Sequence, residues 1–267
     1  MEQPFAYDCD RAALAKPLAA AFVDLREGAE AEHFLAARES HGGLRTLLFR
    51  YLRAWMSDYD AYGYLGMYDM HLLSLAQWRT LLELPESPQS RGTFLDVGAG
   101  RGDITACLTP YYALSMATEL SPPLRRYLPD RGFRVLDRDL CRQALDSDAC
   151  FDLITCLNVI DRVAYPKTLL SHLRDGLAQE GRLVIAVPLP LRPHVDRGRN
   201  TVSQEEPLPR CSDEAFEPQA NSLVEKLLLP LGLRVVRMAR APYVCQGDAH
   251  RSMYVLDDLL VVCRHAS

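Results

Sequence analysis

The stretch that most constrains this chain is Thr93–Asp103, which reads TFLDVGAGRGD. Its apolar residues Phe94, Leu95 and Val97 predict a buried strand, and three glycines at alternate positions follow. Residues 104–108 then predict the opening of a helix. A strand, a glycine turn and a helix are typical of an open α/β sheet that binds a nucleotide-like ligand at its carboxyl edge. Glycine is needed there because the chain turns tightly and a ligand must approach the backbone.

The spacing of the glycines narrows the kind of ligand. A dinucleotide fingerprint would place its third glycine at position 103, which is Asp103. Here an acid, Asp96, precedes Gly98, Gly100 and Gly102. This pattern resembles motif I of the S-adenosylmethionine (SAM) methyltransferases. SAM has a cationic amino-acid end and a ribose diol, and carboxylates can bind both.

A second acid supports this interpretation. Residues 114–120 predict another buried strand, which ends in Glu119. A doubly wound fold places the acid that binds the ribose hydroxyls roughly 20 residues after the glycine turn. Glycine turns also occur in ordinary loops, and a lone glutamate at a strand end is usually a solvated charge. The combination of the two therefore indicates the SAM site.

Strand and helix patterns alternate from residue 93 onward, which favours a parallel-rich sheet. We predict strands at 93–98, 114–119, 133–137, 151–157 and 181–187. The predicted helices are at about 103–109, 122–128, 140–146 and 166–178, the last stopped by Gly181. A helix at about 213–229 and strand-like runs at 233–238 and 254–263 follow. The chain is therefore predicted to be α/β, with the Rossmann-like seven-stranded sheet of a class I SAM-dependent methyltransferase and an antiparallel last strand.

The residues before this sheet have helical periodicity. Apolar spacing predicts helices at 11–25 and 44–56, the segment 61–66 interrupts the pattern, and Ser74 is a candidate N-cap for a helix to about residue 84. We predict an N-terminal helical extension, residues 1–90, packed on a methyltransferase domain, residues 91–267. The extension either covers a sheet edge or forms a lid over the site. The Pro-rich segment 188–212 is long enough to be functional or disordered.

Composition excludes several function classes. The eight cysteines are scattered without metal-ligand spacing, which predicts free thiols in a reducing compartment and no metal site. A net charge of −5 argues against nucleic acid as a partner. There is no run of 18 apolar residues and no secretory signal, so we expect neither a transmembrane span nor export. These observations predict an intracellular, cytoplasmic monomer.

Polar side chains follow the predicted strand 151–157. Asn158 and Asp161 come directly after it, where side chains of this architecture face the ligand crevice near the transferable methyl. Alternatively, Asn158 only terminates the strand and Asp161 caps the next helix. His194, Tyr243 and Tyr254 could approach the same mouth. A lone histidine is more often structural, however, and Tyr254 could be strand packing.

Particular stretches of the sequence carry a resemblance to one family. They are MHLLSLAQW (70–78), FLDVGAGRG (94–102), ATELS (117–121), CLNVIDR (156–162), PYVCQGD (242–248) and YVLDD (254–258). Through them the chain resembles the DREV family, the protein-L-histidine N-pros-methyltransferases, over roughly residues 45–263. Residues 1–40 lie outside the resemblance, and the 188–212 loop departs from the family in length and sequence.

The resemblance implies methyl transfer from SAM to a ring nitrogen of histidine in His-x-His segments of proteins, where x is small. It implies Asp161, Asn158 and Tyr254 as the catalytic residues. The implied cofactor residues are Asp96, Gly98, Gly100, Gly102, Glu119, Leu120, Asp139 and Asn158. The implied substrate residues are Asn158, Asp161, Arg162, Tyr243, Tyr254 and His194. Animal relatives are associated with endomembranes, although no targeting segment is visible here.

The chemistry of histidine agrees with these roles. Its pKa of about 6.5 leaves most of it neutral and nucleophilic at cytosolic pH, so a strong base is unnecessary. N-pros attacks only when the proton sits on N-tele. Asp161 or Asn158 could accept that N–H and select the tautomer. Two alternatives remain: a methyltransferase for a small imidazole compound or another protein side chain, and an inactive SAM-binding interaction module.

Overall fold

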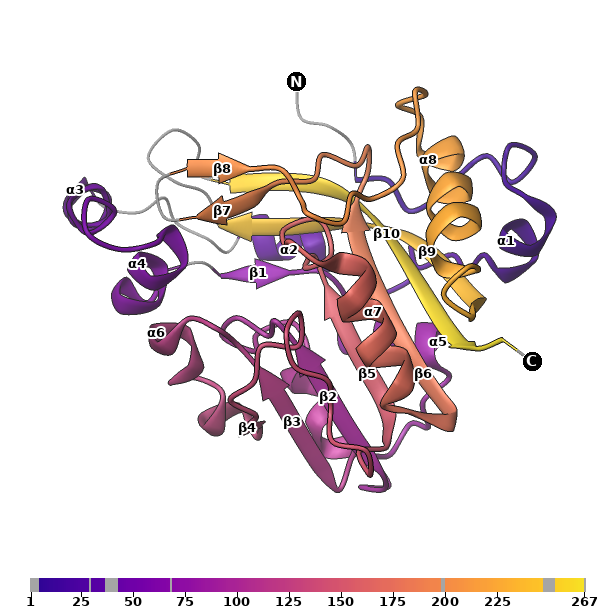
Figure 1. Cartoon of the computed structure of the whole chain (residues 1–267), viewed down its shortest axis with the longest axis horizontal. Helices are drawn as coiled ribbons and strands as arrows, with labels where there is room; N and C mark the ends of the chain where they lie inside the picture. The colour runs from indigo at the N-terminus through magenta and orange to yellow at the C-terminus, as the bar shows by residue number, and fades with distance from the viewer. Residues whose placement is uncertain are drawn as a thin grey trace.

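The computed structural model describes residues 5–28, 30–36, 43–67, 69–197, 200–246 and 253–266. Within these residues, eight strands form one sheet in the order β1-β9-β10-β6-β5-β2-β3-β4 (Figure 1). The strands are β1 (Met70–His71), β2 (Thr93–Val97), β3 (Leu114–Thr118), β4 (Arg134–Val135), β5 (Phe151–Leu157), β6 (Leu177–Pro188), β9 (Leu233–Gln246) and β10 (Met253–His265).

The direction of the strands confirms the predicted plan. β2 is parallel to β3 and β5, β3 is parallel to β4, and β5 is parallel to β6. β10 lies antiparallel between β6 and β9. The class I arrangement of five parallel strands and an inserted antiparallel last strand is therefore present.

Gly181 is placed differently from the prediction. The helix before β6, α7 (Pro166–Asp175), ends at Gly176, and Gly181 lies inside β6. A Cβ at Gly181 would lie 2.7 Å from the carbonyl oxygen of Phe151. The pairing of β5 with β6 also shifts register between Phe151 and Leu153. Gly181 therefore permits a close backbone approach at this irregularity, as glycines inside strands often do.

The sheet has one strand more than the predicted seven. β1 comes from the N-terminal segment and pairs antiparallel with β9, Met70 opposite Cys245 and His71 opposite Val244. Two residues are too few to show the alternating pattern by which a strand is predicted. The segment 1–90 is therefore not purely helical. Its division from the rest at residue 90 stays a prediction.

The N-terminal helices differ in extent from their predictions. α1 covers only Lys16–Ala21, because the chain extends at Phe22 and the Val23 N–H donates to the carbonyl of Met238 in β9. α3 (Gly43–Leu52) ends four residues early. α5 (Leu75–Leu82) has the predicted Ser74 cap, completed by Gln77 as a capping box. The remaining helices of this segment, α2 (Ala31–Ala36) and α4 (Asp58–Leu65), were not predicted.

The interruption predicted at 61–66 is wrong. Ser57 caps α4 by accepting a hydrogen bond from the Asp60 N–H, and Gly66 ends the helix with φ of 62°. Gly63 lies inside the helix, where a Cβ would come within 2.7 Å of Pro123. α4 thus packs on α6 (Pro122–Arg125) through a glycine that the sequence alone presents as a helix breaker.

The helices after β2 are shorter than predicted. The 103–109 helix is the 3₁₀ helix η1 (Ala106–Tyr111), and a second 3₁₀ turn, η2 (Pro129–Arg131), follows α6. The predicted 140–146 helix is absent, and the Asp139 carboxylate accepts the Cys141 N–H in a turn instead. The 213–229 helix is α8 (Phe216–Leu223), continued by the π-helical turn η3 (Val224–Leu228). Within 188–212, β7 (Val195–Arg197) and β8 (Asn200–Val202) form an antiparallel hairpin.

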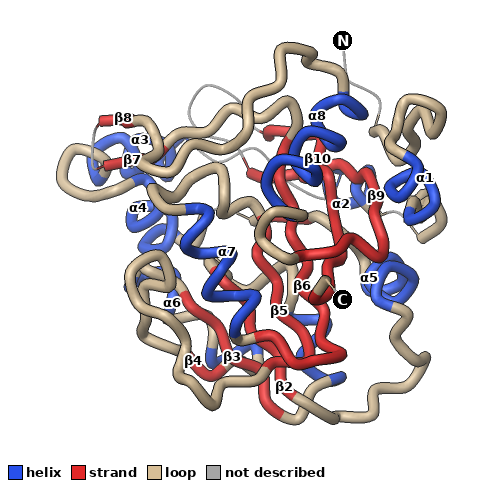
Figure 2. The backbone as a smooth tube through the Cα atoms, turned by 45° about the vertical axis from the view of Figure 1, so that its right-hand side comes forward, coloured by secondary structure: helices blue, strands red, loops and turns tan. Residues whose placement is uncertain are grey.

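Two apolar cores lie on opposite faces of the sheet. α1, α7 and α8 cover one face, with Leu170 and Leu223 fully buried. α5 and η1 cover the other, where Trp78 and Leu108 are also fully buried. Burial of each such side chain contributes about 1.5–3 kcal/mol. The hairpin β7–β8 lies beside α3 and α4, near the carboxyl ends of the parallel strands (Figures 1 and 2).

Candidate active site

The glycine turn between β2 and η1 uses a backbone that only glycine adopts easily. Gly98, Gly100 and Gly102 have φ of 66°, 58° and 79°. A Cβ at Gly98 would lie 2.7 Å from Cγ2 of Val159, which follows β5. The turn therefore brings the end of β2 directly against the segment after β5.

Glu119 is fixed against this turn. One carboxylate oxygen accepts the Gly100 N–H at 2.8 Å and the other accepts the Ser121 N–H at 2.7 Å. Burial raises the pKa of Glu119, and these two donors oppose the rise. Each oxygen has a second lone pair, so the carboxylate can still accept the two hydroxyls of a ribose. The residues thus fit the ribose end of SAM.

Asp96 lies beneath the turn and is buried. It accepts hydrogen bonds from the hydroxyls of Thr105 and, at 2.6 Å, of Thr155. Burial raises the pKa of Asp96 to about 6, and the two threonine hydroxyls oppose the rise. Asp96 therefore ties β2, β5 and the residue before η1 together while its carboxyl borders the cavity described below.

Asp96→Asn should make stability less dependent on pH. Because its pKa in the folded protein lies above the ordinary 3.8, Asp96 holds a proton between about pH 4 and 6 that the unfolded chain has lost. Stability from this group falls as pH rises through that window, by up to ~3 kcal/mol. We expect the Tm of the variant, relative to wild type, to be higher at pH 7.5 than at pH 4.5. A Tm difference that is the same at both pH values would contradict the assignment.

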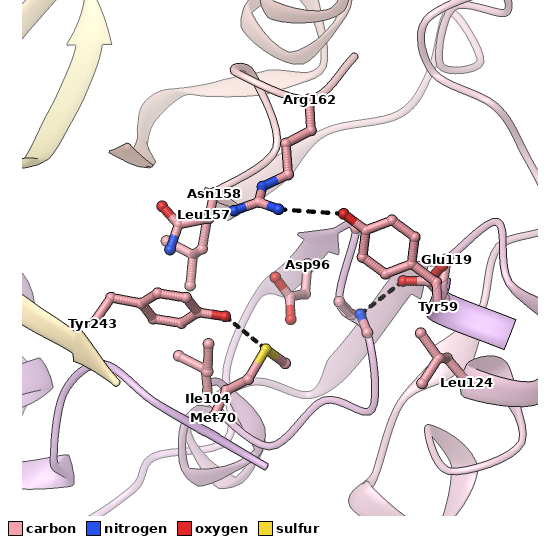
Figure 3. A pocket seen from close by; sticks show the side chains of 13 residues that line it. Tyr59, Met70, Asp96, Ile104, Glu119, Leu124, Leu157, Asn158, Arg162 and Tyr243 are labelled. Carbon is pink, nitrogen blue, oxygen red and sulfur yellow. Dashed lines mark hydrogen bonds between the residues drawn. The ribbon is translucent and has the colours of Figure 1, made fainter. Parts of the chain in front are cut away.

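A small cavity of about 80 Å³ lies at the carboxyl edge, above the turn (Figure 3). Asp96, Gly98, Gly100 and Glu119 border it, as predicted. The other lining residues are Tyr59, Met70, Ala99, Ile104, Leu124, Leu157, Asn158, Arg162 and Tyr243. The volume is below the roughly 300–1,000 Å³ usual for ligand pockets, and Tyr59, Met70 and Tyr243 are among the side chains that narrow it.

The side chains over the cavity come partly from the N-terminal segment. Tyr59 of α4 accepts a 3.4 Å hydrogen bond from Arg162, and the Tyr243 hydroxyl lies 2.7 Å from the sulfur of Met70 (Figure 3). Tyr59 and Met70 were missed by sequence reasoning, because nothing local marks a residue that reaches a site from another segment. The extension contributes Tyr59 and Met70 to the cavity, and it also covers the sheet edge at β9 through β1, so both interpretations of the extension stay open.

The acceptor side is built around Asn158 and Asp161. Asn158 has φ of 56°, which is uncommon for a residue other than glycine. Its Nδ2 donates to Asp258 at 2.9 Å. Asn158 Oδ1, Asp161 Oδ1 and Asp258 Oδ1 are buried and have no hydrogen-bond partner among the described residues. Buried acceptors of this kind normally have a donor, so these three oxygens remain able to accept hydrogen bonds from a ligand or from water.

Asp161 is only 3% exposed. Burial raises the pKa of its carboxyl, and the nearby Arg162 opposes the rise, its Nε lying 3.6 Å from Asp161 Oδ2. The alternative in which Asp161 caps the following helix is not seen: α7 begins at Pro166 after Tyr165, with no side-chain cap. Asp161 is therefore a buried carboxyl held at the site without a structural partner for one of its oxygens.

Tyr254 and His194 were also predicted as site residues, and neither lines the cavity. Tyr254 pairs with Cys245 on the same face of the sheet as Tyr243, although it does not line the cavity. His194 touches Asp161 through its backbone, its N–H donating to the Asp161 carbonyl at 2.9 Å. The last two residues of the stretch 242–248, Gly247 and Asp248, are outside the described residues.

Three residues that were predicted to bind the cofactor do not line the cavity. Leu120 is 65% exposed and Asp139 bonds its own turn, and neither lines the cavity, so their cofactor roles stay predictions. Gly102 has contacts away from the cavity, with its Cβ position facing Leu128. Asp103, which occupies the place of a third dinucleotide glycine, forms an ion pair with Arg131.

A wider cavity of about 510 Å³ lies on the other side of Tyr59. Its walls are the end of α3, the start of α4 and the β7–β8 hairpin. The lining residues are Arg50, Arg53, Ala54, Ser57, Asp58, Tyr59, Asp196 and Thr201. All three elements are additions to the seven-stranded plan, and Tyr59 is common to the two cavities.

Several solved structures are similar to this chain. Among solved structures, the chain is similar to the DhpI–SAH complex, with 17% identity, a TM-score of 0.47 and coverage of 84% of this chain and 98% of that chain. It is also similar to the N-methyltransferase NodS from Bradyrhizobium japonicum WM9 in complex with S-adenosyl-L-homocysteine (18%, TM-score 0.45, 71% and 84%). A third is an S-adenosylmethionine-dependent methyltransferase from Clostridium acetobutylicum ATCC 824 (15%, TM-score 0.45, 66% and 84%).

No helix in the described part of the chain is both long and apolar enough to cross a membrane. The family model described as DREV methyltransferase matches residues 6–265, which is nearly the whole sequence. The match includes the glycine turn, Glu119, and the segment that carries Asn158 and Asp161. The chain thus belongs to the DREV methyltransferase family, and its cofactor is S-adenosylmethionine.

Proposed function

We propose that this enzyme methylates the N-pros nitrogen of histidine in His-x-His segments of proteins, where x is a small residue. The observation that carries the proposal is the pair of buried, unpartnered oxygens Asn158 Oδ1 and Asp161 Oδ1, of which Asn158 lines the cofactor cavity. A neutral imidazole has one N–H and one free lone pair, so it can satisfy an acceptor while its other nitrogen reacts.

The role of Asp161 follows from this chemistry. Its carboxylate accepts the N-tele proton, which fixes the tautomer and leaves the N-pros lone pair free. SAM supplies a methyl group on a positively charged sulfur. As the N–C bond forms and the C–S bond breaks, the electron pair of that bond goes to sulfur and the positive charge moves to the imidazole ring. A buried carboxylate beside the ring stabilises this charge.

Asn158, Tyr254 and Tyr243 are proposed to fix the ring plane. Binding of the ring in one orientation replaces an encounter in solution by a positioned one, which is a large part of the acceleration in such reactions. Arg162 is proposed to contact the substrate from the other wall of the cavity, and His194 from the segment before β7.

The wider cavity supports a polypeptide substrate. It adjoins the cofactor cavity through Tyr59, and its lining carries both signs of charge: Arg50 and Arg53, and Asp58 and Asp196. Arg53 forms an ion pair with Asp58 at 2.6 Å. Residues that flank the methylated histidine could lie there. A free imidazole compound would not need this surface.

The test is an assay with tritiated SAM and three acceptors: a peptide containing His-Ala-His, free histidine and a peptide with lysine and arginine only. We expect label in the first alone, and mass spectrometry of the hydrolysate should give the N-pros isomer. Label in free histidine would favour a small imidazole substrate. Label in the third peptide would overturn histidine as the acceptor. SAM binding without label in any acceptor would favour the inactive module.

A further inference from the structure

Asp258 is fully buried and is not used by the mechanism above. It lies in β10, where it is paired with Pro188 of β6 on one side and with Ala241 of β9 on the other. Side chains alternate along a strand, so Asp258 and Tyr254, four residues apart, lie on the same face. Its Oδ2 accepts the Asn158 Nδ2 at 2.9 Å, and its Oδ1 has no partner among the described residues.

The hydrogen bond fixes which end of the Asn158 amide faces the site. The Asn158 backbone is held by its N–H, which donates to the Ala186 carbonyl at 2.9 Å, and by its φ of 56°. Asp258 Oδ2 accepts from the amide NH₂, so Asn158 Oδ1 is the free end. Burial raises the pKa of Asp258 well above its ordinary value, and the hydrogen bond from Asn158 opposes the rise.

We propose that Asp258 is a positioning residue that makes Asn158 present an oxygen, and not an NH₂, to the methyl acceptor. The inference rests on the proposed function for the identity of the acceptor. An oxygen at Asn158 accepts an imidazole N–H, as Asp161 does. An NH₂ there would donate to the lone pair of the ring nitrogen that faces it, and the ring proton would then sit on the nitrogen that must react. Asp258 therefore selects the reactive tautomer by acting through Asn158.

The charged groups around Asp258 come from two segments. Asp161 and Arg162 act from the segment after β5, and Asp257 acts from β10 itself. Asp257 is tied to Arg240 of β9 by two hydrogen bonds of 2.6 and 2.8 Å and lies on the other face of the strand. Asp257 therefore offers a matched control: a neighbouring carboxyl with a partner of its own and no bond to Asn158.

The first test reads the amide directly and does not depend on the acceptor. In protein labelled with ¹⁵N-asparagine and bound to S-adenosyl-L-homocysteine, the Asn158 NH₂ should exchange slowly in wild type and in Asp257→Asn. In Asp258→Ala it should exchange at least about tenfold faster, since its acceptor is gone. Equal protection in Asp258→Ala would overturn the proposal. If this variant does not fold, Asp258→Val is measured in its place, because it also lacks an acceptor and fills more of the space.

The second test is turnover of the His-Ala-His peptide at saturating SAM. Asp258→Asn has nearly the same shape, and its amide can pair with Asn158 in either orientation. We expect kcat to fall about tenfold, and the KM for the peptide and the Kd for SAM to change less than about twofold. Asp257→Asn should leave kcat unchanged. A wild-type kcat in Asp258→Asn would overturn the proposal, and loss of SAM binding together with kcat would show a purely structural role. If wild type forms no methylhistidine, the proposed function fails, and the exchange measurement alone decides the role of Asp258.

Discussion

Asp161→Ala should lower kcat by about 10²–10³-fold on a His-x-His peptide, the loss usual when one preorganised group that stabilises developing charge is removed. The Asp161 carboxyl is 3% exposed, and its Oδ1 is unpartnered among the described residues. It does not line the cofactor cavity. The Kd for SAM should therefore stay within about twofold of wild type. A tenfold change in Kd would require the binding free energy to change by about 1.4 kcal/mol.

Two measurements separate the binding of SAM from the chemical step. Calorimetry gives the Kd for SAM, and a single-turnover rate on the saturated complex gives the chemical step. Asp161→Asn keeps an acceptor oxygen without the charge, so its single-turnover rate should lie between those of Asp161→Ala and wild type. Asp130→Ala, an exposed carboxyl in η2, is the control and should change neither value. Loss of SAM binding with unchanged turnover of bound complex would show that Asp161 belongs to the cofactor site.

The core of the fold was predictable because its strands are buried on both faces. β2, β3 and β5 are short apolar runs bounded by turn residues, and the structure gives their limits within a residue of the prediction. β1 was missed, since two residues show no period. α4 was missed because Gly63 looks like a breaker. Only the contact with Pro123 of α6 explains why glycine is needed there.

The cofactor half of the site was predictable from spacing, and the acceptor half only in part. Glu119 follows from its distance to the glycine turn, and parallel strands bring both to one edge of the sheet. Tyr59 could not be predicted, because it reaches the cavity from a separate helix. Asp258 was visible only as the last residue of the stretch 254–258. Its bond to Asn158 joins residues 100 positions apart, and no local pattern encodes such a pair.

Gly98→Arg should remove detectable SAM binding. Gly98 lines the cavity of about 80 Å³ and has φ of 66°. An arginine there would both strain the backbone and fill the space next to Glu119. The smaller change Gly98→Ala tests the turn itself. Its Cβ would lie 2.7 Å from Val159 Cγ2, so either the turn or the segment after β5 must shift.

In Gly98→Ala the turn can relax while SAM is absent, and binding must then restore it. Restoring a strained backbone costs about 1–3 kcal/mol, and the contact with Val159 adds to this, so the Kd for SAM should rise at least about fivefold. Gly232→Ala is the matched control: its φ is 73°, and its Cβ would have only Arg174 atoms at 3.9 Å as neighbours. It carries a similar backbone strain away from the site. We expect its Tm to fall about as far as that of Gly98→Ala while its Kd stays at the wild-type value. Equal Kd values for the two variants, measured by calorimetry, would mean that the glycine turn does not hold the cofactor.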